Sequence, residues 1–142
     1  MKRRLKKLRK ESGGKLILDT SFLIELLDRG RSDLVAVLSK YTEIYIPWVC
    51  LYEYLYGHKV GRNICDKELK KRKENVEFLG SVLWCSQEFL LRALGLDYQL
   101  SKKGLKIPFS DLIVATFVIL LDAKLATFDR KHFGFIENRI VP

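Results

Sequence analysis

The fold of this chain is decided by residues 16–28, which read LILDTSFLIELLD. The apolar run at residues 16–18 predicts a short buried strand, and the apolar spacing over residues 21–28 predicts a helix. Asp19 stands at the junction between the two. A strand that passes directly into a helix is the beginning of a parallel strand–helix–strand unit, so an α/β fold is expected.

Outside this stretch, short apolar runs continue to alternate with helical periods. Strands that alternate with helices, and that are apolar on both faces, predict a three-layer α/β sandwich with a mainly parallel central sheet flanked by helices. The expected strands are residues 43–46, 81–85 and 124–127, with a candidate fifth strand at 139–141, and the expected helices are residues 32–40 (capped by Ser32), 48–56 (closed by Gly57), 65–79, 87–102 and 111–121.

Length and composition restrict the class of protein. The 142 residues are 48% hydrophobic, which is enough for one domain with its own core. No apolar run approaches the ~18 residues that a membrane span needs. The basic first residues are not followed by an apolar segment, so we expect no secretion signal and a cytoplasmic location. Cys50, Cys65 and Cys85 stand at unrelated spacings and are expected to be free thiols.

Most of the net charge of +9 lies at the start of the chain. Residues 1–15 hold eight of the 26 basic side chains and one of the 17 acidic ones, so they carry +7 and the rest of the chain carries only +2. A Ser-Gly-Gly stretch at residues 12–14 follows the basic run and predicts a flexible joint. We therefore expect a basic tail over residues 1–14 and a domain over residues 15–142. The tail could strengthen binding to the phosphates of a nucleic acid, or it could be merely solvated.

Four acidic side chains stand at prominent places in this pattern. Asp19 follows the first strand, Asp129 follows the strand at residues 124–127, Asp111 begins an apolar helix, and Glu53 lies inside another. Taken singly, Asp19 and Asp111 could be helix N-caps, Asp129 a turn residue, and Glu53 part of a solvated face. Taken together, they are expected at the carboxyl edge of the sheet, where α/β proteins bind ligands.

Four carboxylates at one edge repel one another unless a cation neutralises them. Sites built from oxygen ligands alone favour Mg²⁺ or Mn²⁺. A metal of this kind activates water and stabilises an in-line displacement at phosphorus. The acids therefore predict a metal-dependent enzyme that acts on phosphate esters.

The chain resembles the PIN domain family, and within it the VapC-like toxin ribonucleases of prokaryotic toxin–antitoxin pairs. Four segments carry the resemblance: LILDTSFLIELL, LYEYLYG with its glutamate, PFSDLIVATF, and ATFDRKHF. The more specific parts are Asp-Thr-Ser after a strand and the Thr-x-Asp-x-x-x-Phe pattern at residues 127–133. The resemblance covers the chain from Lys15 to its C-terminus and depends on the order and spacing of all four acids.

The resemblance implies a parallel sheet flanked by helices, one or two bound Mg²⁺ or Mn²⁺ ions, and an endoribonuclease that cleaves RNA. It also implies a homodimer and a protein antitoxin as partner. The catalytic and metal-binding positions are Asp19, Glu53, Asp111 and Asp129, and the small polar residues that support them are Thr20, Ser21, Ser110 and Thr127.

Other classes of phosphate-handling protein fit this sequence less well. A P-loop NTPase is excluded because the chain has no G-x-x-x-x-G-K-[ST]. A phosphoryl-accepting receiver needs an aspartate at the end of its third strand, where this chain reads SVLWCS, and a haloacid-dehalogenase-type phosphatase needs an aspartate where Ser21 stands. Two alternatives stay open: a PIN nuclease in RNA processing, and a non-catalytic PIN-like module that binds RNA or protein.

Several further residues have a structural and a functional interpretation. His58 and His132 are expected at the surface, although either could contact RNA or transfer a proton. The basic run at residues 67–73 is expected to be a solvated helix face, although it could contact phosphates. The aromatic side chains of residues 48–56 are expected in the core or a dimer interface, although they could stack on bases.

Overall fold

The computed structural model describes residues 13–142, and residues 1–12 lie outside the described residues. The predicted basic tail therefore falls almost entirely outside the part of the chain that the structure describes.

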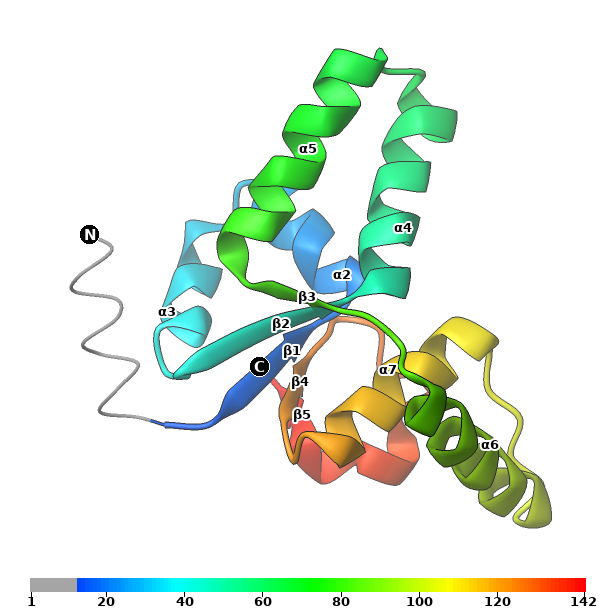
Figure 1. Cartoon of the computed structure of the whole chain (residues 1–142). Coiled ribbons are helices and arrows are strands. Elements are labelled where there is room, and N and C mark those ends of the chain that lie inside the picture. Colours follow the sequence, from blue (N-terminus) through cyan, green and yellow to red (C-terminus); the bar gives the residue numbers. More distant parts are fainter. Residues whose placement is uncertain (1–12) are drawn as a thin grey trace.

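One sheet of five parallel strands forms the centre of the domain, in the order β3-β2-β1-β4-β5 (Figure 1). The central strand β1 (Lys15–Leu18) lies between β2 (Glu43–Pro47) and β4 (Lys124–Ala126), and the short strands β3 (Ser81–Leu83) and β5 (Ile140–Val141) form the edges. The chain builds β2 and β3 on one side of β1 and then crosses to β4 on the other. The strand order therefore switches between β1 and β4, which is where open α/β sheets place their ligands.

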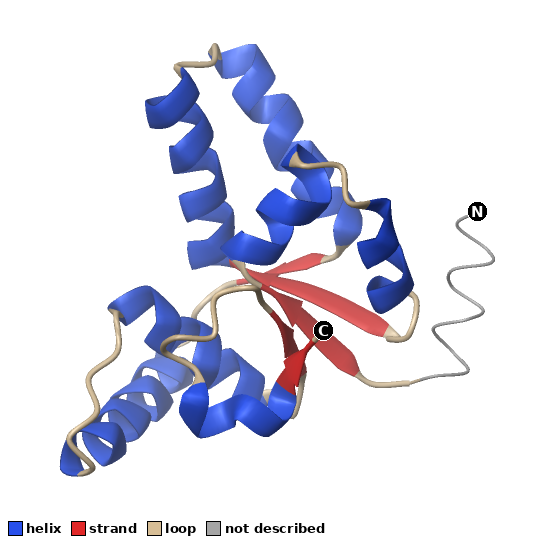
Figure 2. Cartoon of the chain, turned by 180° about the vertical axis from the view of Figure 1, so that it is seen from behind, coloured by secondary structure: helices blue, strands red, loops and turns tan. Residues whose placement is uncertain are grey.

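Helices cover both faces of this sheet, which confirms the predicted sandwich. Helices α3, α4 and α5 lie on one side, and α6 and α7 lie on the other (Figures 1 and 2). The helices are α2 (Thr20–Leu23), α3 (Val35–Leu38), α4 (Trp48–Tyr56), α5 (Asp66–Leu79), α6 (Gln87–Lys102) and α7 (Phe109–Leu120).

Two of the predicted helices are less regular than their apolar spacing suggests. The helix expected over residues 21–28 is α2 followed by a π-helical turn at Ile24–Asp28. The helix expected over residues 32–40 is a 3₁₀ turn at Ser32–Leu34 followed by α3, and Ser32 lies inside the turn instead of capping it. Apolar spacing indicates which face is buried, but it does not separate α-helix from the tighter and wider turns.

Gly57 follows the end of α4 at Tyr56, as predicted, but it does not end the helical path of the chain. Its φ is −59°, in the right-handed helical region, and the chain continues as a π-helical turn through Gly61. A glycine ends a helix when it adopts positive φ, so its presence after an apolar run does not by itself decide the end.

The core is made by the sheet and by α7. Residues 16–18 of β1 are fully buried, and every residue of α7 from Leu112 to Val118 is buried. Gly80 precedes β3, and a Cβ on it would lie 2.3 Å from the carbonyl oxygen of Ile44 in β2. Only glycine therefore allows this close approach of β3 to β2. Within residues 13–142, no helix is long and apolar enough to span a membrane.

Candidate active site

The end of β1 meets the end of β4 at the switch in strand order. Asp19 directly follows β1, and its main-chain N–H donates a 3.3 Å hydrogen bond to the carbonyl of Ala126, the last residue of β4. Thr127 and Asp129 continue from β4 at the same edge. Two of the four predicted acids thus reach one edge because their strands are parallel neighbours with the register Leu18 opposite Ala126.

Two side chains and one main-chain N–H hold the carboxylate of Asp19 in place. Ser21 Oγ donates a 2.6 Å hydrogen bond to Asp19 Oδ1, and the N–H of Phe22 donates a 3.0 Å bond to the same oxygen. Thr127 Oγ1 donates to Asp19 Oδ2. Asp19 is therefore the N-cap of α2, as its cap interpretation predicted, and it also belongs to the polar cluster at the sheet edge. A carboxylate offers about four lone-pair sites. These three bonds leave Oδ2 able to accept one more partner.

Burial dominates the electrostatics of Asp19, which is only 7% exposed. The pKa of Asp19 is raised to about 6. Loss of solvation is the largest cause, the hydrogen bonds from Ser21, Thr127 and Phe22 oppose it, and the nearby charge of Asp129 adds a smaller rise. An acid that is costly to ionise in the metal-free protein would gain from a nearby cation.

Thr127 joins Asp19 to Asp129. The main-chain N–H of Asp129 donates a 3.0 Å hydrogen bond to Thr127 Oγ1, while the same hydroxyl donates to Asp19. Ser21 Oγ closes the arrangement from the other side, because it accepts a 2.9 Å bond from the N–H of Phe128. The predicted polar supports Ser21 and Thr127 thus contact the acid cluster directly.

Asp111 lies in the first turn of α7 and forms an ion pair with a histidine. Pro108 occupies the N-cap position of α7, so the N-cap interpretation of Asp111 is wrong. Asp111 Oδ2 lies 2.9 Å from His132 Nδ1. Burial raises the pKa of Asp111, the charge of Asp129 raises it further, and His132 opposes both. The neighbouring Ser110 is half-buried, and its hydroxyl makes no hydrogen bond within residues 13–142.

Glu53 reaches the same edge from α4. Thr20 Oγ1 donates a 3.3 Å hydrogen bond to Glu53 Oε1, and it also lies 3.5 Å from the carbonyl oxygen of Cys50. Partial burial raises the pKa of Glu53, the bond from Thr20 lowers it, and the charge of Asp111 raises it. Electrostatic repulsion thus links the four acids in a series. Asp129 interacts with Asp19 and with Asp111, and Asp111 interacts with Glu53.

The donor set is that of a hard divalent cation. Carboxylate and hydroxyl oxygens are the donors at this edge, as Mg²⁺ and Mn²⁺ prefer. Within the described chain, no three carboxylate, imidazole or thiol groups converge as a complete set of metal ligands. The chemistry of these oxygen donors fits such a cation, and a cation would relieve the repulsion between the acids. In this structure, however, the four carboxylates are spread along the edge and do not yet form a closed set of ligands.

His132 was missed as a site residue, because a lone histidine six residues after the end of β4 carries no signal of its partner. His132 was predicted at the surface, but its side chain is only 30% exposed because the ring lies against Asp111. The structure also buries His58, which is only 3% exposed, and overturns its predicted surface position.

His58 belongs to a second polar cluster, made of Asp28, Tyr54, His58, Arg62 and Arg72. Tyr54 Oη donates a 2.7 Å hydrogen bond to Asp28 Oδ1, and His58 Nε2 lies 3.1 Å from Asp28 Oδ2. Arg72 and Arg62 reach within 3.8 and 4.0 Å of the same carboxylate. None of the four candidate acids takes part, so this cluster is separate from the sheet edge.

The aromatic side chains of α4 divide between core and surface. Tyr54 is buried and Trp48 half-buried, while Tyr52 and Tyr56 are exposed and stack on each other with ring centroids 6.2 Å apart. The prediction that these aromatic side chains pack in the core therefore holds for only part of the helix. All three cysteines are free, with Cys50 buried and the other two exposed.

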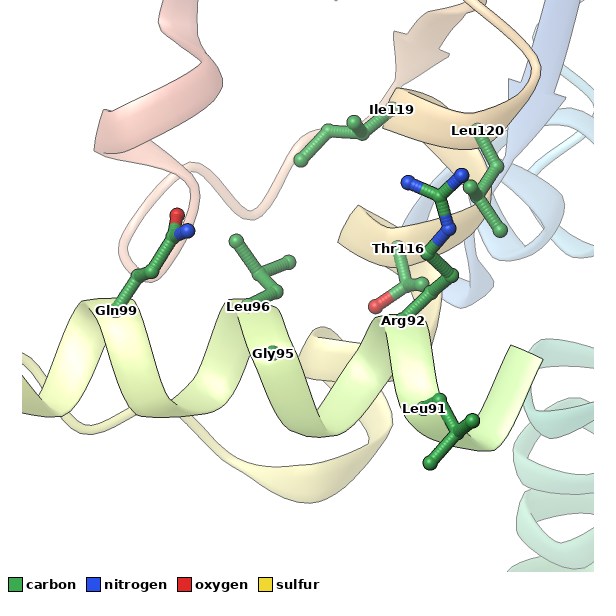
Figure 3. Close-up of a pocket in the computed structure, with 8 residues that line it drawn as sticks. All are labelled: Leu91, Arg92, Gly95, Leu96, Gln99, Thr116, Ile119 and Leu120. Atoms are coloured by element: carbon green, nitrogen blue, oxygen red, sulfur yellow. The ribbon is translucent and has the colours of Figure 1, made fainter. Parts of the chain in front are cut away.

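Surface cavities lie on both sides of α7. A groove of about 270 Å³ runs between α6 and α7, with Arg92 and Thr116 beside the apolar Leu96, Ile119 and Leu120 (Figure 3). A more apolar cavity of about 310 Å³ lies at the start of the same helices, near Trp48 and Phe109. A third, of about 360 Å³, includes His132 in its wall. None of the four acids lines any of these cavities.

Comparison with known proteins agrees with this architecture. Solved structures with the same fold include VapBC-1 from nontypeable Haemophilus influenzae (TM-score 0.75, 20% identity, 89% of this chain and 96% of that one). VapBC2 from Rickettsia felis bound to a promoter DNA fragment gives a TM-score of 0.73 at 23% identity, over 90% of this chain and 97% of that one. DNA-bound VapBC from Salmonella typhimurium gives 0.76 at 18% identity, over 89% and 96%.

Comparison with curated proteins gives no match. The family model of the PIN domain matches residues 16–136, which is most of the chain and includes all four candidate acids. This match confirms the family that the sequence segments suggested. The chain therefore belongs to the PIN domain family.

Proposed function

We propose that residues 15–142 form a metal-dependent endoribonuclease that hydrolyses RNA phosphodiester bonds. The observation that carries the proposal is the sheet edge itself. Burial raises the pKa of Asp19, Glu53 and Asp111 there, the charge of Asp129 adds to the rise for Asp19 and Asp111, and the charge of Asp111 adds to it for Glu53. Within the described residues, His132 is the only basic side chain within ion-pair distance of any of the four acids. Acids gathered with so little compensating charge favour a site for a cation.

The cation that fits is Mg²⁺ or Mn²⁺. Asp19, Asp111 and Asp129 would be the main residues that hold it, and Glu53 would complete the set or orient the attacking water. When bound, such a metal lowers the pKa of water and neutralises charge that develops at phosphorus.

The remaining residues of the edge keep these acids in place. Ser21 and Thr127 fix the carboxylate of Asp19, Thr20 holds Glu53, and His132 holds Asp111. Fixed ligands need little rearrangement when the cation and the RNA arrive, which is how surrounding residues contribute to such sites.

We further propose that the protein is the toxin of a toxin–antitoxin pair and acts in the cytoplasm. The supporting observation is the fold that it shares with the VapBC proteins, and with a structure described as a toxin–antitoxin complex from Klebsiella pneumoniae (TM-score 0.67, 20% identity, 89% of this chain and 96% of that one). An antitoxin would silence the edge most simply by placing an arginine or lysine among the carboxylates.

A homodimer belongs to the same proposal, although the structure suggests another surface than α4 for it. Leu90, Leu94 and Tyr98 repeat every four residues along α6 and are each at least 60% exposed. This apolar stripe continues to Phe109 and the cavity beside it. A second copy related by a twofold axis could cover both stripes at once. Light scattering at micromolar concentration should give a dimer, and Leu94→Lys should give a monomer.

Cleavage of a labelled single-stranded RNA tests the enzymatic part. The wild type should cleave with Mg²⁺ or Mn²⁺ and stop in EDTA. Asp111→Asn should lose roughly a hundredfold in rate or more, because a carboxylate that orients the reaction is gone. Asp66→Asn, which changes an exposed acid at the start of α5, is the matched control and should cleave as the wild type does. Undiminished cleavage by Asp111→Asn in EDTA would overturn the proposal.

A further inference from the structure

The cavity beside His132 has a lining unlike that of the acidic edge next to it. Its volume is about 360 Å³, within the range of small-ligand sites. One wall is the loop between α6 and α7, and the other is the turn that follows Asp129. The lining residues are Leu105, Lys106, Ile107, Lys131, His132, Gly134 and Phe135.

His132 connects this cavity to the candidate active site. The ring belongs to the cavity wall, and Nδ1 of the same ring lies 2.9 Å from Asp111 Oδ2. A ligand in the cavity would therefore lie next to the carboxylates, one side chain away from Asp111.

The charge of the lining favours an anion. Lys106 and Lys131 are exposed, and neither forms an ion pair or side-chain hydrogen bond within residues 13–142. No acidic residue lines the cavity. Leu105, Ile107 and Phe135 give the same cavity an apolar wall. Cations beside an apolar and aromatic wall suit a ligand that has both a phosphate and a flat base.

We propose that this cavity binds the nucleotide of single-stranded RNA that flanks the scissile phosphate. Lys106 and Lys131 bind its phosphate, the apolar wall packs against its base, and His132 acts as a positioning residue that orients Asp111 beside the bound strand. This inference rests on the proposed function. We assign the cavity to RNA and not to the proposed antitoxin. An antitoxin segment that carries an arginine or lysine would be repelled by Lys106 and Lys131, whereas an RNA phosphate would be attracted.

Binding in EDTA tests the cavity without cleavage. The full chain is titrated against a fluorescent single-stranded oligoribonucleotide, and anisotropy is followed at several salt concentrations. The test variant is Lys106→Ala/Lys131→Ala. The matched control is Lys70→Ala/Lys71→Ala, which removes the same charge from exposed positions on α5.

The cavity variant should bind RNA about two- to thirtyfold more weakly, as expected for two ion pairs of partly exposed groups. Its salt dependence should be less steep by about 1.4, since each phosphate contact with a single strand contributes about 0.7. The α5 control should change affinity less than twofold. Equal losses in both variants, or no RNA binding by the wild type, would overturn the assignment. Unchanged RNA binding together with weaker binding of poly-L-glutamate would assign the cavity to an acidic protein segment instead.

The role of His132 is tested by exchanging its atoms. His132→Ala removes both the ring and the contact with Asp111, whereas His132→Asn keeps a donor near the place of Nδ1. The alanine variant should lower kcat by about tenfold or more, as loss of a supporting partner does, and the asparagine variant should recover most of it. Equal kcat in all three proteins would remove the positioning role.

The two levels of the proposal fail in different ways. If the wild type cleaves no RNA with Mg²⁺ or Mn²⁺ but the cavity variant binds RNA more weakly, then the enzyme is wrong and the cavity stands as an RNA site. If the wild type cleaves and the lysine variant binds and cleaves like it, the cavity assignment alone is overturned.

Discussion

The molecule contains two clusters of polar side chains, each around one buried aspartate, and they differ in how their charges are balanced. In the cluster around Asp28, one carboxylate meets a tyrosine hydroxyl, a histidine and two arginines. At the sheet edge, the carboxylates of Asp19 and Glu53 meet hydroxyl groups and that of Asp111 meets a single histidine. The carboxylate of Asp129 has no such partner within residues 13–142. The first cluster is balanced by its own residues, and the second is not. A fold keeps an unbalanced cluster at a cost in stability, which is common where a ligand completes it.

The largest effect on stability is expected where the balance is complete. Asp28→Asn leaves His58 and two arginines around a neutral amide, so we expect a loss of about 3 kcal/mol in the free energy of unfolding, as for one partner removed from a buried ion pair. Urea unfolding followed by circular dichroism measures it. Asp66→Asn, which removes an exposed carboxylate paired with Lys59, is the control and should cost little. A neutral outcome for Asp28→Asn would mean that this cluster does not stabilise the fold.

Metal should stabilise the protein only through the unbalanced cluster. Mg²⁺ or Mn²⁺ at a hundred times its dissociation constant should raise the free energy of unfolding of the wild type by about 2.7 kcal/mol through mass action. Asp28→Asn should keep this gain, while Asp111→Asn should lose most of it. Thermal melts with and without metal measure the difference. The same response in both variants would place the metal elsewhere.

Without metal, replacing an aspartate by asparagine should change the free energy of unfolding in opposite directions in the two clusters. Asp111→Asn removes one of several like charges while an amide oxygen can still accept from His132. It should therefore stabilise the metal-free protein by roughly 0.5–2 kcal/mol. Melting in EDTA tests this, and a lower melting temperature than that of the wild type would show that Asp111 is structural.

The smallest expected effect is a pH dependence from His58. Burial lowers its pKa below the ordinary value, Arg72 and Arg62 lower it further, and Asp28 partly opposes them. The folded protein therefore binds this proton less readily than the unfolded chain. The stability that neutral His58 contributes is complete above about pH 6.5 and is lost as the pH falls below it.

Asp19 contributes a pH dependence of stability opposite to that of His58, because its pKa is raised to about 6 in the folded protein. In metal-free protein it favours folding as the pH falls through that value. The difference between wild type and His58→Asn in unfolding at pH 7 and pH 5 isolates the histidine. If acid destabilises both proteins equally, His58 contributes nothing to it.

The sequence predicted the sheet better than the details of its helices. The bounds of α4 and α6 are those that the apolar spacing predicts, and all five strands lie within the predicted regions or a residue beyond them. These features depend on burial of one or both faces, which periodicity records directly. The π-helical turns and the split helix at residues 32–38 depend on how the main chain adjusts to its neighbours, which periodicity does not record.

For the candidate site, the sequence alone predicted four acids and their position near one edge of the sheet. Asp19 and Asp129 follow neighbouring parallel strands, and Asp111 begins the buried helix beside them, so topology brings them to one place. Only the tertiary structure decided that Asp19 is both a cap and a member of the cluster, that His132 pairs with Asp111, and that His58 is buried with Asp28. The contacts of Asp19 with Thr127, of Asp111 with His132 and of Asp28 with His58 join side chains far apart in sequence. Such contacts depend on packing in three dimensions, and a local pattern of residues has no information about it.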